Sequence, residues 1–171
     1  MADYGLLAKQ IVSLAEVDAH WLPVLSNAAA LLWGALDDIN WAGFYLVDPS
    51  TTVEPDASPS AHEPRTPELR LGPFQGKVAC VRIPFGRGVC GTAAETKTSQ
   101  LVEDVHQFPG HIACDSASNS EVVVPIFKDG QVVGVLDIDS PSVARFTQED
   151  LTGLEQVVKA LESCANFSDF C

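Results

Sequence analysis

Long apolar runs and basic residues are what this chain has least of. No stretch of about 18 consecutive apolar residues occurs, so we expect no membrane-spanning helix. No basic-then-apolar signal segment opens the sequence, and we therefore expect a cytoplasmic location. Only 10 Lys and Arg stand against 23 Asp and Glu, which gives a formal net charge of −13. Nucleic acid and anionic membranes are disfavoured as partners, because binding either requires a basic patch that replaces counterions.

Cysteine is sparse and irregularly spaced. The five cysteines are an odd number, and no two of them have the CxxC spacing that is typical of zinc sites and redox motifs. A secreted disulfide scaffold would be denser in cysteine. We therefore expect no metal, and thiols that are free or redox-active in a reducing compartment. The cysteines are Cys80, Cys90, Cys114, Cys164 and Cys171.

What the chain does contain is the pattern of an α+β domain. With 171 residues, 46% of them hydrophobic, it is long enough to bury one sizeable core, so we expect a single domain over 1–171. Helices are predicted over 3–17, 20–37, 88–96 and 146–163, and strands over 40–48, 68–74, 77–85, 99–103, 121–129 and 131–140. Most connections are too short for βαβ crossovers. We expect a mostly antiparallel six-stranded sheet with the N-terminal and C-terminal helices packed on it.

Local patterns refine this outline. Residues 48–68 contain five prolines and few apolar residues, which predicts an inserted surface loop without chemistry. A hairpin is expected with Asp129 and Gly130 at its turn, and Thr147 is expected to cap the last helix. In the second helix, an apolar stripe predicts the face that packs on the sheet: Leu22, Leu25, Ala29, Leu32 and Leu36.

The segment FGRGVCG contains a GxGxxG pattern, formed by Gly86, Gly88 and Gly91, that is typical of dinucleotide-binding loops. The predicted helix after it is short, and no parallel βαβ units surround it. The glycines are therefore expected to form a tight turn from strand to helix. Cys90 then lies near a helix N-terminus, where unpaired N–H groups and the helix dipole favour a thiolate.

Two other cysteines differ in their surroundings. Cys80 lies in the predicted strand KVACVRI, where the role of a small buried apolar residue is expected. Cys114 lies in GHIACDSASNSEVVVPI, within a predicted loop over 104–120 that is rich in polar residues and glycine. It is the better candidate for an exposed, reactive thiol. His111 stands three residues earlier, and whether it helps the thiol to ionise stays open. The two C-terminal cysteines are assigned no chemistry.

Carboxylates and aromatic rings are predicted to gather beside this loop. In GVLDIDS, Asp137 and Asp139 are two residues apart in a strand and therefore share a face. Glu121 opens the partner strand of the hairpin, and Trp41 and Tyr45 share one face of the strand at 40–48. The acids either face solvent or line a pocket. If they cluster, they raise one another's pKa, and one of them can stay protonated at neutral pH.

Thiols next to a proton donor favour reductive chemistry. A thiolate attacks the sulfur of a sulfoxide or the oxygen of a peroxide, an acid protonates the oxygen, and a sulfenic acid remains on the cysteine. A second cysteine condenses with the sulfenic acid, and an external dithiol reduces the resulting disulfide. A sulfoxide oxygen is the poorer leaving group and needs the acid more. Three carboxylates therefore favour a sulfoxide as the substrate.

Five segments carry a resemblance to a known family: NWAGFY (40–45), LGPFQGKVAC (71–80), GRGVCGTAA (86–94), EDVHQFPGHIACDSASNSE (103–121) and GVLDIDS (134–140). Together they resemble the free methionine-(R)-sulfoxide reductases, which are built on a GAF domain. The resemblance covers roughly 3–163 of the chain. Its motifs are specific, because an ordinary ligand-sensing GAF domain lacks three cysteines at these places. The Pro-rich insert and the Cys-ending tail depart from the family pattern, and the insert could partly cover the pocket.

The resemblance implies reduction of free L-methionine (R)-sulfoxide, with thioredoxin as the reductant and with no metal or cofactor. Cys114 would be the catalytic thiol, and Cys80 and Cys90 would be the recycling cysteines, in an order that stays open. The acids Glu121, Asp137 and Asp139 would hold the substrate ammonium group and activate the sulfoxide oxygen; which of them donates the proton also stays open.

The remaining parts of the implied site bind the substrate's other groups. Trp41 would pack on the substrate methyl group, with Tyr45 as its neighbour. Backbone N–H groups near Ser116, Ala117 and Ser118 would take the substrate carboxylate. A homodimer through the N-terminal helices is expected by analogy alone.

Two other functions fit the same residues. A GAF-type sensor of a small ligand would use the acids and leave the cysteines idle. A thiol peroxidase or redox sensor would use the same cysteines on peroxide. Consumption of a reductant in the presence of methionine sulfoxide distinguishes these alternatives from a reductase.

Overall fold

The computed structural model describes residues 2–51, 66–110 and 116–170. Its helices are α1 (Tyr4–Ala15), α2 (Trp21–Ala35), α3 (Gly88–Thr96) and α4 (Gln148–Cys164). Its strands are β1 (Trp41–Val47), β2 (Glu68–Gly76), β3 (Arg82–Pro84), β4 (Gln100–Val102), β5 (Ser120–Lys128) and β6 (Gln131–Ser140). Three short 3-10 turns complete it: η1 (Pro49–Thr51), η2 (Val105–Gln107) and η3 (Ser168–Phe170).

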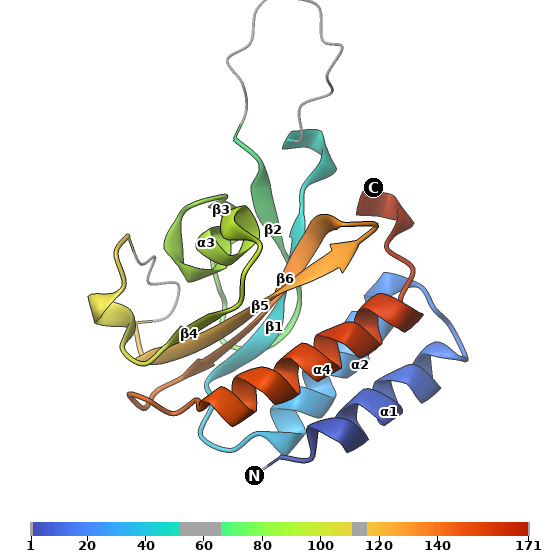
Figure 1. Ribbon diagram of the computed structural model, residues 1–171, viewed down its shortest axis with the longest axis horizontal. Coiled ribbons are helices and arrows are strands. Elements are labelled where there is room, and N and C mark those ends of the chain that lie inside the picture. Colours follow the sequence, from blue (N-terminus) through green and yellow to red (C-terminus); the bar gives the residue numbers. More distant parts are fainter. Residues whose placement is uncertain (1, 52–65, 111–115, 171) are drawn as a thin grey trace, which may run out of the picture.

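The strands form one six-stranded sheet in the order β3-β2-β1-β6-β5-β4, and every neighbouring pair is antiparallel. The predicted α+β architecture is therefore confirmed. Helices α1, α2 and α4 lie on one face of the sheet, and α3 lies on the other (Figure 1). Among the described helices, none combines the length and the apolar character that a membrane crossing requires.

The helical face of the sheet carries the larger core. Alternation along β1 sends Ala42, Phe44 and Leu46 to this face, where they join the buried residues of the three helices. Of the stripe predicted in α2, Leu25, Ala29, Leu32 and Leu36 are buried. Leu22 is 47% exposed, so its predicted contact with the sheet is wrong. It stands in the first turn of α2, where it borders a surface pocket instead of the core.

The start of α4 is fixed by an acid that the sequence analysis did not single out. Thr147 caps the helix as predicted, and Asp150 completes a capping box with it. Asp150 also accepts a hydrogen bond of 2.6 Å from the hydroxyl of Tyr4 in α1. The Tyr4 ring lies so close to Gly153 that a Cβ there would be 2.1 Å from Tyr4 Cδ2. These contacts hold α1 against α4.

The opposite face carries a second core beneath α3. Gly86 and Gly88 adopt positive φ angles of 74° and 61°, and a Cβ on Gly91 would lie 2.3 Å from the Pro84 carbonyl oxygen. The three glycines of the GxGxxG pattern thus form the predicted tight turn and let α3 pack against β3. The N–H of Gly88 donates to the Gly110 carbonyl oxygen, which ties α3 to the segment after η2.

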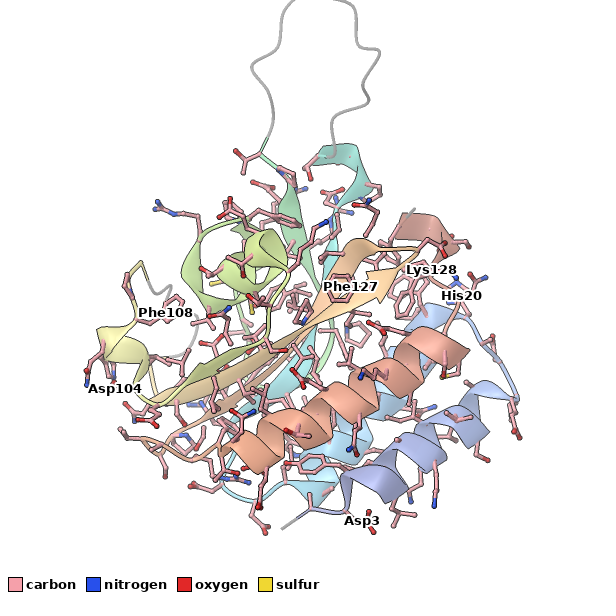
Figure 2. All side chains as sticks on the ribbon, in the orientation of Figure 1. Asp3, His20, Asp104, Phe108, Phe127 and Lys128 are labelled. Carbon is pink, nitrogen blue, oxygen red and sulfur yellow. The ribbon has the colours of Figure 1, made fainter. Side chains whose placement is uncertain are left out.

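Strand register decides which residues meet on the α3 face. The β5–β6 hairpin turns at Asp129 and Gly130, both with positive φ, as predicted. Its pairing sets Glu121 opposite Asp139, and the β1–β6 pairing sets Trp41 opposite Asp139 on the other side. Side chains fill the layers on both faces of the sheet, and Figure 2 places Asp104 and Phe108 around η2, beyond β4.

Two segments depart from the predicted outline. The strand predicted at 77–85 is wrong over 77–81, where the chain is irregular, because β3 begins only at Arg82. The predicted loop at 48–68 begins with η1 and ends at β2, and its middle, 52–65, lies outside the described residues. The prediction of one domain with a Pro-rich insertion therefore stays a prediction.

Candidate active site

A cluster of one thiol and two carboxylic acids lies between the sheet and α3. Glu121 comes from β5, Asp137 from β6 and Cys90 from the first turn of α3. The Cys90 thiol donates to Glu121 Oε1 at 3.9 Å, and the Sγ and carboxylate oxygens of the three residues lie within 4.8 Å of one another. All three side chains are buried. Of the two predicted alternatives for the acids, solvent exposure or a pocket, the structure rules out the first for Glu121 and Asp137.

Burial decides the protonation of this cluster. Desolvation and the nearby Asp137 charge raise the pKa of Glu121 well above its usual value. Burial raises the pKa of Asp137 to about 6, an effect that hydrogen bonding to Cys90 and Glu121 opposes. Glu121 is thus the group that keeps its proton at neutral pH. The sequence-based expectation that clustered acids leave one member protonated agrees with this.

The prediction of a thiolate at Cys90 is wrong. Burial, followed by the charges of Asp137 and Glu121, raises the pKa of the Cys90 thiol well above its usual value. Cys90 does lie at the start of a helix, where the dipole favours a thiolate. Burial outweighs that effect, because a thiolate would lose its hydration there and would also be repelled by the nearby Asp137 carboxylate. Cys90 is therefore a neutral thiol that donates a hydrogen bond.

Two polar atoms in this region lack hydrogen-bond partners within the described part of the chain. They are Asp137 Oδ1 and Trp41 Nε1, both buried. An unsatisfied buried polar atom costs on the order of 1–3 kcal/mol, so native structures rarely keep one without a reason. One orphan is an acceptor and the other is a donor. Together they are suited to a ligand that carries both a positive donor and an acceptor oxygen.

Three aromatic rings form one wall of the site. The Trp41 ring stacks on Tyr45, with centroids 5.7 Å apart, and on Phe74 of β2, with centroids 5.3 Å apart. This arrangement depends on Gly43, where a Cβ would lie 2.3 Å from Phe74 Cβ and 2.7 Å from Trp41 Cη2. The predicted shared face of Trp41 and Tyr45 is confirmed. Phe74 was missed, because its place opposite Gly43 follows from the β1–β2 register, which the sequence does not state.

Cys80 is fixed beside this wall. The Tyr45 hydroxyl, whose pKa is raised by burial, keeps its proton and donates to the Cys80 carbonyl oxygen at 3.0 Å. Cys80 is half-buried and forms a disulfide, so its predicted role as a buried apolar residue of a strand is wrong. Among the described residues, Cys90 and Cys164 are free thiols.

The end of the loop before β5 is held close to the same wall. Ser118 is buried and accepts a hydrogen bond of 3.0 Å from Asn40 Nδ2, next to Trp41. Ser116 is exposed and Ala117 is half-buried. Asp139 is also half-buried, between Trp41 and Glu121 in the sheet register. The predicted catalytic Cys114 and the neighbouring His111 lie outside the described residues, so their roles stay predictions.

The cluster of Cys90, Glu121 and Asp137 is also the described group whose ligand atoms are close enough to hold a metal ion. Metal binding requires a thiolate and ionised carboxylates. The raised pKa values of Cys90 and Glu121 make their ionisation costly at neutral pH. In the metal-free cluster, Cys90 and Glu121 therefore keep their protons, and Cys90 donates a hydrogen bond to Glu121.

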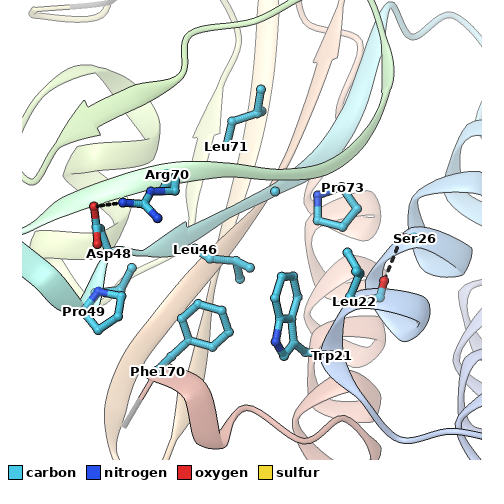
Figure 3. A pocket seen from close by; sticks show the side chains of 12 residues that line it. Trp21, Leu22, Ser26, Leu46, Asp48, Pro49, Arg70, Leu71, Pro73 and Phe170 are labelled. Atoms are coloured by element: carbon cyan, nitrogen blue, oxygen red, sulfur yellow. Dashed lines mark hydrogen bonds and ion pairs between the residues drawn. The ribbon is translucent and has the colours of Figure 1, made fainter.

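A pocket of about 440 Å³ on the helical face offers a contrast. It is lined mainly by apolar side chains, among them Trp21, Leu22 and Phe170 (Figure 3). Its one acid, Asp48, is already paired with Arg70 and Arg82, and the Asp48 pKa is lowered, chiefly by hydrogen bonding to Ser50. This pocket lacks reactive groups, so the chemistry belongs to the α3 face.

Comparison with known proteins matches this geometry to a family. A family model of the GAF domain matches residues 24–163. A free methionine-R-sulfoxide reductase of Escherichia coli is 48% identical over 167 residues, which cover 98% of this chain and 91% of the relative. The chain belongs to the GAF-domain family of free methionine-R-sulfoxide reductases.

Solved structures of this family superpose on the chain over nearly its whole length. The reduced form of the fRMsr of Staphylococcus aureus is 50% identical, with a TM-score of 0.81 and 97% of each chain covered. The free methionine-R-sulfoxide reductase of Neisseria meningitidis, in complex with its substrate, is 42% identical, with a TM-score of 0.83. The match covers 97% of this chain and 90% of that one. The resemblance drawn from the five sequence segments is confirmed.

Proposed function

We propose that this protein reduces free L-methionine (R)-sulfoxide to L-methionine and is regenerated by thioredoxin. One observation carries the proposal beyond family membership: Asp137 Oδ1 and Trp41 Nε1 are buried without partners in the described structure, beside a protonated Glu121. A free amino acid sulfoxide offers an ammonium group for the acid and an acceptor oxygen for a donor. Asp137 Oδ1 can therefore accept from the substrate ammonium group, and Trp41 Nε1 can donate to an oxygen of the substrate.

Substrate binding follows from these groups. Asp137, aided by Asp139, accepts hydrogen bonds from the substrate ammonium group, while the substrate methyl group packs on the Trp41 ring. Backbone N–H groups near Ser116, Ala117 and Ser118 take the substrate carboxylate. A methionine sulfoxide within a protein has no ammonium group, so it would leave the Asp137 charge buried and unpaired. Selectivity for the free amino acid has this physical cause.

Reduction requires one thiolate and one proton in the first step. The Cys114 thiolate attacks the sulfoxide sulfur, and Glu121 protonates the oxygen as it leaves that sulfur. Transfer of the hydroxyl group to the cysteine releases methionine and leaves a sulfenic acid on Cys114, so the thiolate is oxidised by two electrons. The neutral Cys90 thiol, which donates to Glu121 Oε1, stabilises the carboxylate that remains.

Recycling begins with Cys80. Its thiol attacks the sulfenic acid, water leaves, and a Cys80–Cys114 disulfide forms. Two facts favour Cys80 over Cys90 for this step: Cys80 is disulfide-bonded in the structure, whereas Cys90 is free and holds its proton. Thioredoxin then reduces the disulfide, and Cys90 acts only as a later recycling thiol. A thioredoxin-dependent cycle with free thiols belongs to a reducing compartment, which supports the cytoplasm as the location.

We also retain the homodimer as part of the proposal. Five large apolar side chains on α1 and α2 are exposed: Leu6, Val12, Leu14, Leu22 and Trp33. Sedimentation of the purified chain would show a dimer if this surface is used, and a monomer would remove this part of the proposal.

The test is a coupled assay with thioredoxin, thioredoxin reductase and NADPH. We expect turnover of free L-methionine (R)-sulfoxide but not of the (S) epimer. Cys114→Ser should abolish this turnover, and Cys164→Ser, the matched control on α4, should leave it unchanged. Hydrogen peroxide as a much better substrate than the sulfoxide, or full turnover by Cys114→Ser, would contradict the proposal.

A further inference from the structure

The surface beside Cys80 is unlike the rest of this acidic chain. Val78 is 87% exposed and Val81 is 65% exposed, and the two flank the half-buried Cys80 in an irregular segment. An exposed aliphatic side chain alone is ordinary. Two of them on either side of a disulfide-bonded cysteine make an apolar surface at the one place that a reductant must reach.

Charge distinguishes the same segment. Residues 69–94 contain four of the 10 Lys and Arg in the chain and none of its 23 Asp and Glu. Arg70 and Arg82 pair with Asp48, and Arg82 also pairs with Glu68, so the positive charge of this surface comes from Lys77 and Arg87. Lys77 is exposed next to Val78. Because the whole chain carries a formal charge of −13, an acidic partner is repelled less by this segment than by the rest of the chain.

The backbone of this segment is held in place. The Tyr45 hydroxyl donates to the Cys80 carbonyl oxygen at 3.0 Å, and the N–H of Leu71 donates to the Val81 carbonyl oxygen at 3.0 Å. A surface fixed by β1 and β2 loses little conformational freedom when a partner binds. Val78 and Val81 thus form a preorganised contact surface around the disulfide.

We propose that Val78, Val81 and Lys77 form the docking surface for thioredoxin, which has to present a complementary apolar and acidic surface around its own dithiol. This inference rests on the proposed function, since it assigns the place where the recycling partner binds. The attacking thiolate of thioredoxin forms a bond with Cys80 Sγ, the Cys80–Cys114 bond breaks, and Cys114 leaves as a thiolate. The second thiol of thioredoxin then attacks the mixed disulfide and releases Cys80, so two electrons and two protons pass from the dithiol.

The experiment compares two reductants on the same enzyme. Dithiothreitol needs no docking surface, whereas thioredoxin does. The test variant is the double substitution Val78→Ser and Val81→Ser, and the matched control is Val17→Ser, a valine that is 89% exposed just after α1 on the helical side. Turnover of the sulfoxide is measured with each reductant. Neither exposed valine contributes to the buried core, so the fold is retained.

We expect the double variant to lose roughly tenfold in kcat/KM for thioredoxin, because two aliphatic contacts are removed, and to keep its turnover with dithiothreitol. Raising the salt concentration should lower kcat/KM for thioredoxin in the wild type and leave the dithiothreitol reaction unchanged. Val17→Ser should match the wild type with both reductants.

Three results would overturn the inference. They are an unchanged kcat/KM for thioredoxin in the double variant, an equal loss with both reductants, and a wild-type enzyme that accepts dithiothreitol but not thioredoxin. Failure of the proposed function itself has a different signature, since the wild type would then reduce no methionine sulfoxide with either reductant.

Discussion

Two aspartates, one on each face of the sheet, are equally buried but differ in their hydrogen bonding and in the direction of their pKa shifts. Asp137 and Asp150 are each 6% exposed. Asp150 accepts hydrogen bonds from the Tyr4 hydroxyl and from the backbone and side chain of Thr147, and its pKa is lowered. Asp137 keeps one oxygen without a partner in the described structure, and its pKa is raised to about 6. Burial therefore does not identify a functional acid; unsatisfied hydrogen bonding does.

The comparison extends to the aromatic rings beside each acid. Tyr4 on the helical face and Trp41 on the α3 face both lie against a glycine, Gly153 and Gly43 respectively. The Tyr4 hydroxyl has Asp150 as its partner, but Trp41 Nε1 has none among the described residues. On the helical face, the acid and the aromatic side chain are hydrogen-bonded to each other. On the α3 face, Asp137 Oδ1 and Trp41 Nε1 are left for a ligand.

Replacing the two acids should affect different properties, namely turnover for Asp137 and stability for Asp150. Asp137→Asn should reduce turnover by about a hundredfold, because an electrostatic contact to the substrate is removed, while the free energy of unfolding at pH 7 does not fall. Asp150→Ala should lower the free energy of unfolding by about 2 kcal/mol, since a helix cap and the Tyr4 contact are lost, with normal turnover per folded molecule. Coupled assays and urea denaturation measure the two quantities. Normal turnover by Asp137→Asn would end the distinction between the two faces.

The pH dependence of stability should also have opposite signs for the two acids. The raised pKa of Asp137 means that its ionisation opposes folding, so its cost is absent below about pH 4 and complete above about pH 6. Asp137→Asn should therefore stabilise the protein by about 3 kcal/mol at pH 8 and have little effect at pH 4. The lowered pKa of Asp150 means that its contribution is present at pH 7 and is lost as the pH falls below about 4. Urea denaturation tests these signs, with Asp137→Asn measured at pH 8 and pH 4 and Asp150→Ala measured at pH 7 and at about pH 2 to 3. A constant difference between Asp137→Asn and the wild type would contradict them.

The sequence predicted the parts of both faces that depend on local periodicity. Alternation along β1 and β6 placed Trp41 with Tyr45 and Asp137 with Asp139, because a strand has a period of two. The turn at Asp129 and Gly130 fixed the hairpin that brings Glu121 alongside.

What the sequence could not give is set by contacts between distant segments. The neutral state of Cys90 depends on Glu121 and Asp137, which lie 31 and 47 positions later in the chain. Segment 77–81 has the alternating apolar residues of a strand, yet β3 pairs only from Arg82, which leaves Val78 and Val81 exposed. Local pattern predicts which elements exist, but register and packing decide what each side chain meets.

The most direct test of the account is calorimetric binding to the inactive Cys114→Ser variant. Free L-methionine (R)-sulfoxide should bind at least about a hundredfold more tightly than its N-acetyl derivative, because only the free amino acid pairs the buried Asp137 oxygen. Adding Asp137→Asn to the variant should remove most of that difference. Equal affinity of the two ligands for Cys114→Ser would contradict the claim that the unsatisfied acid on the α3 face recognises the substrate.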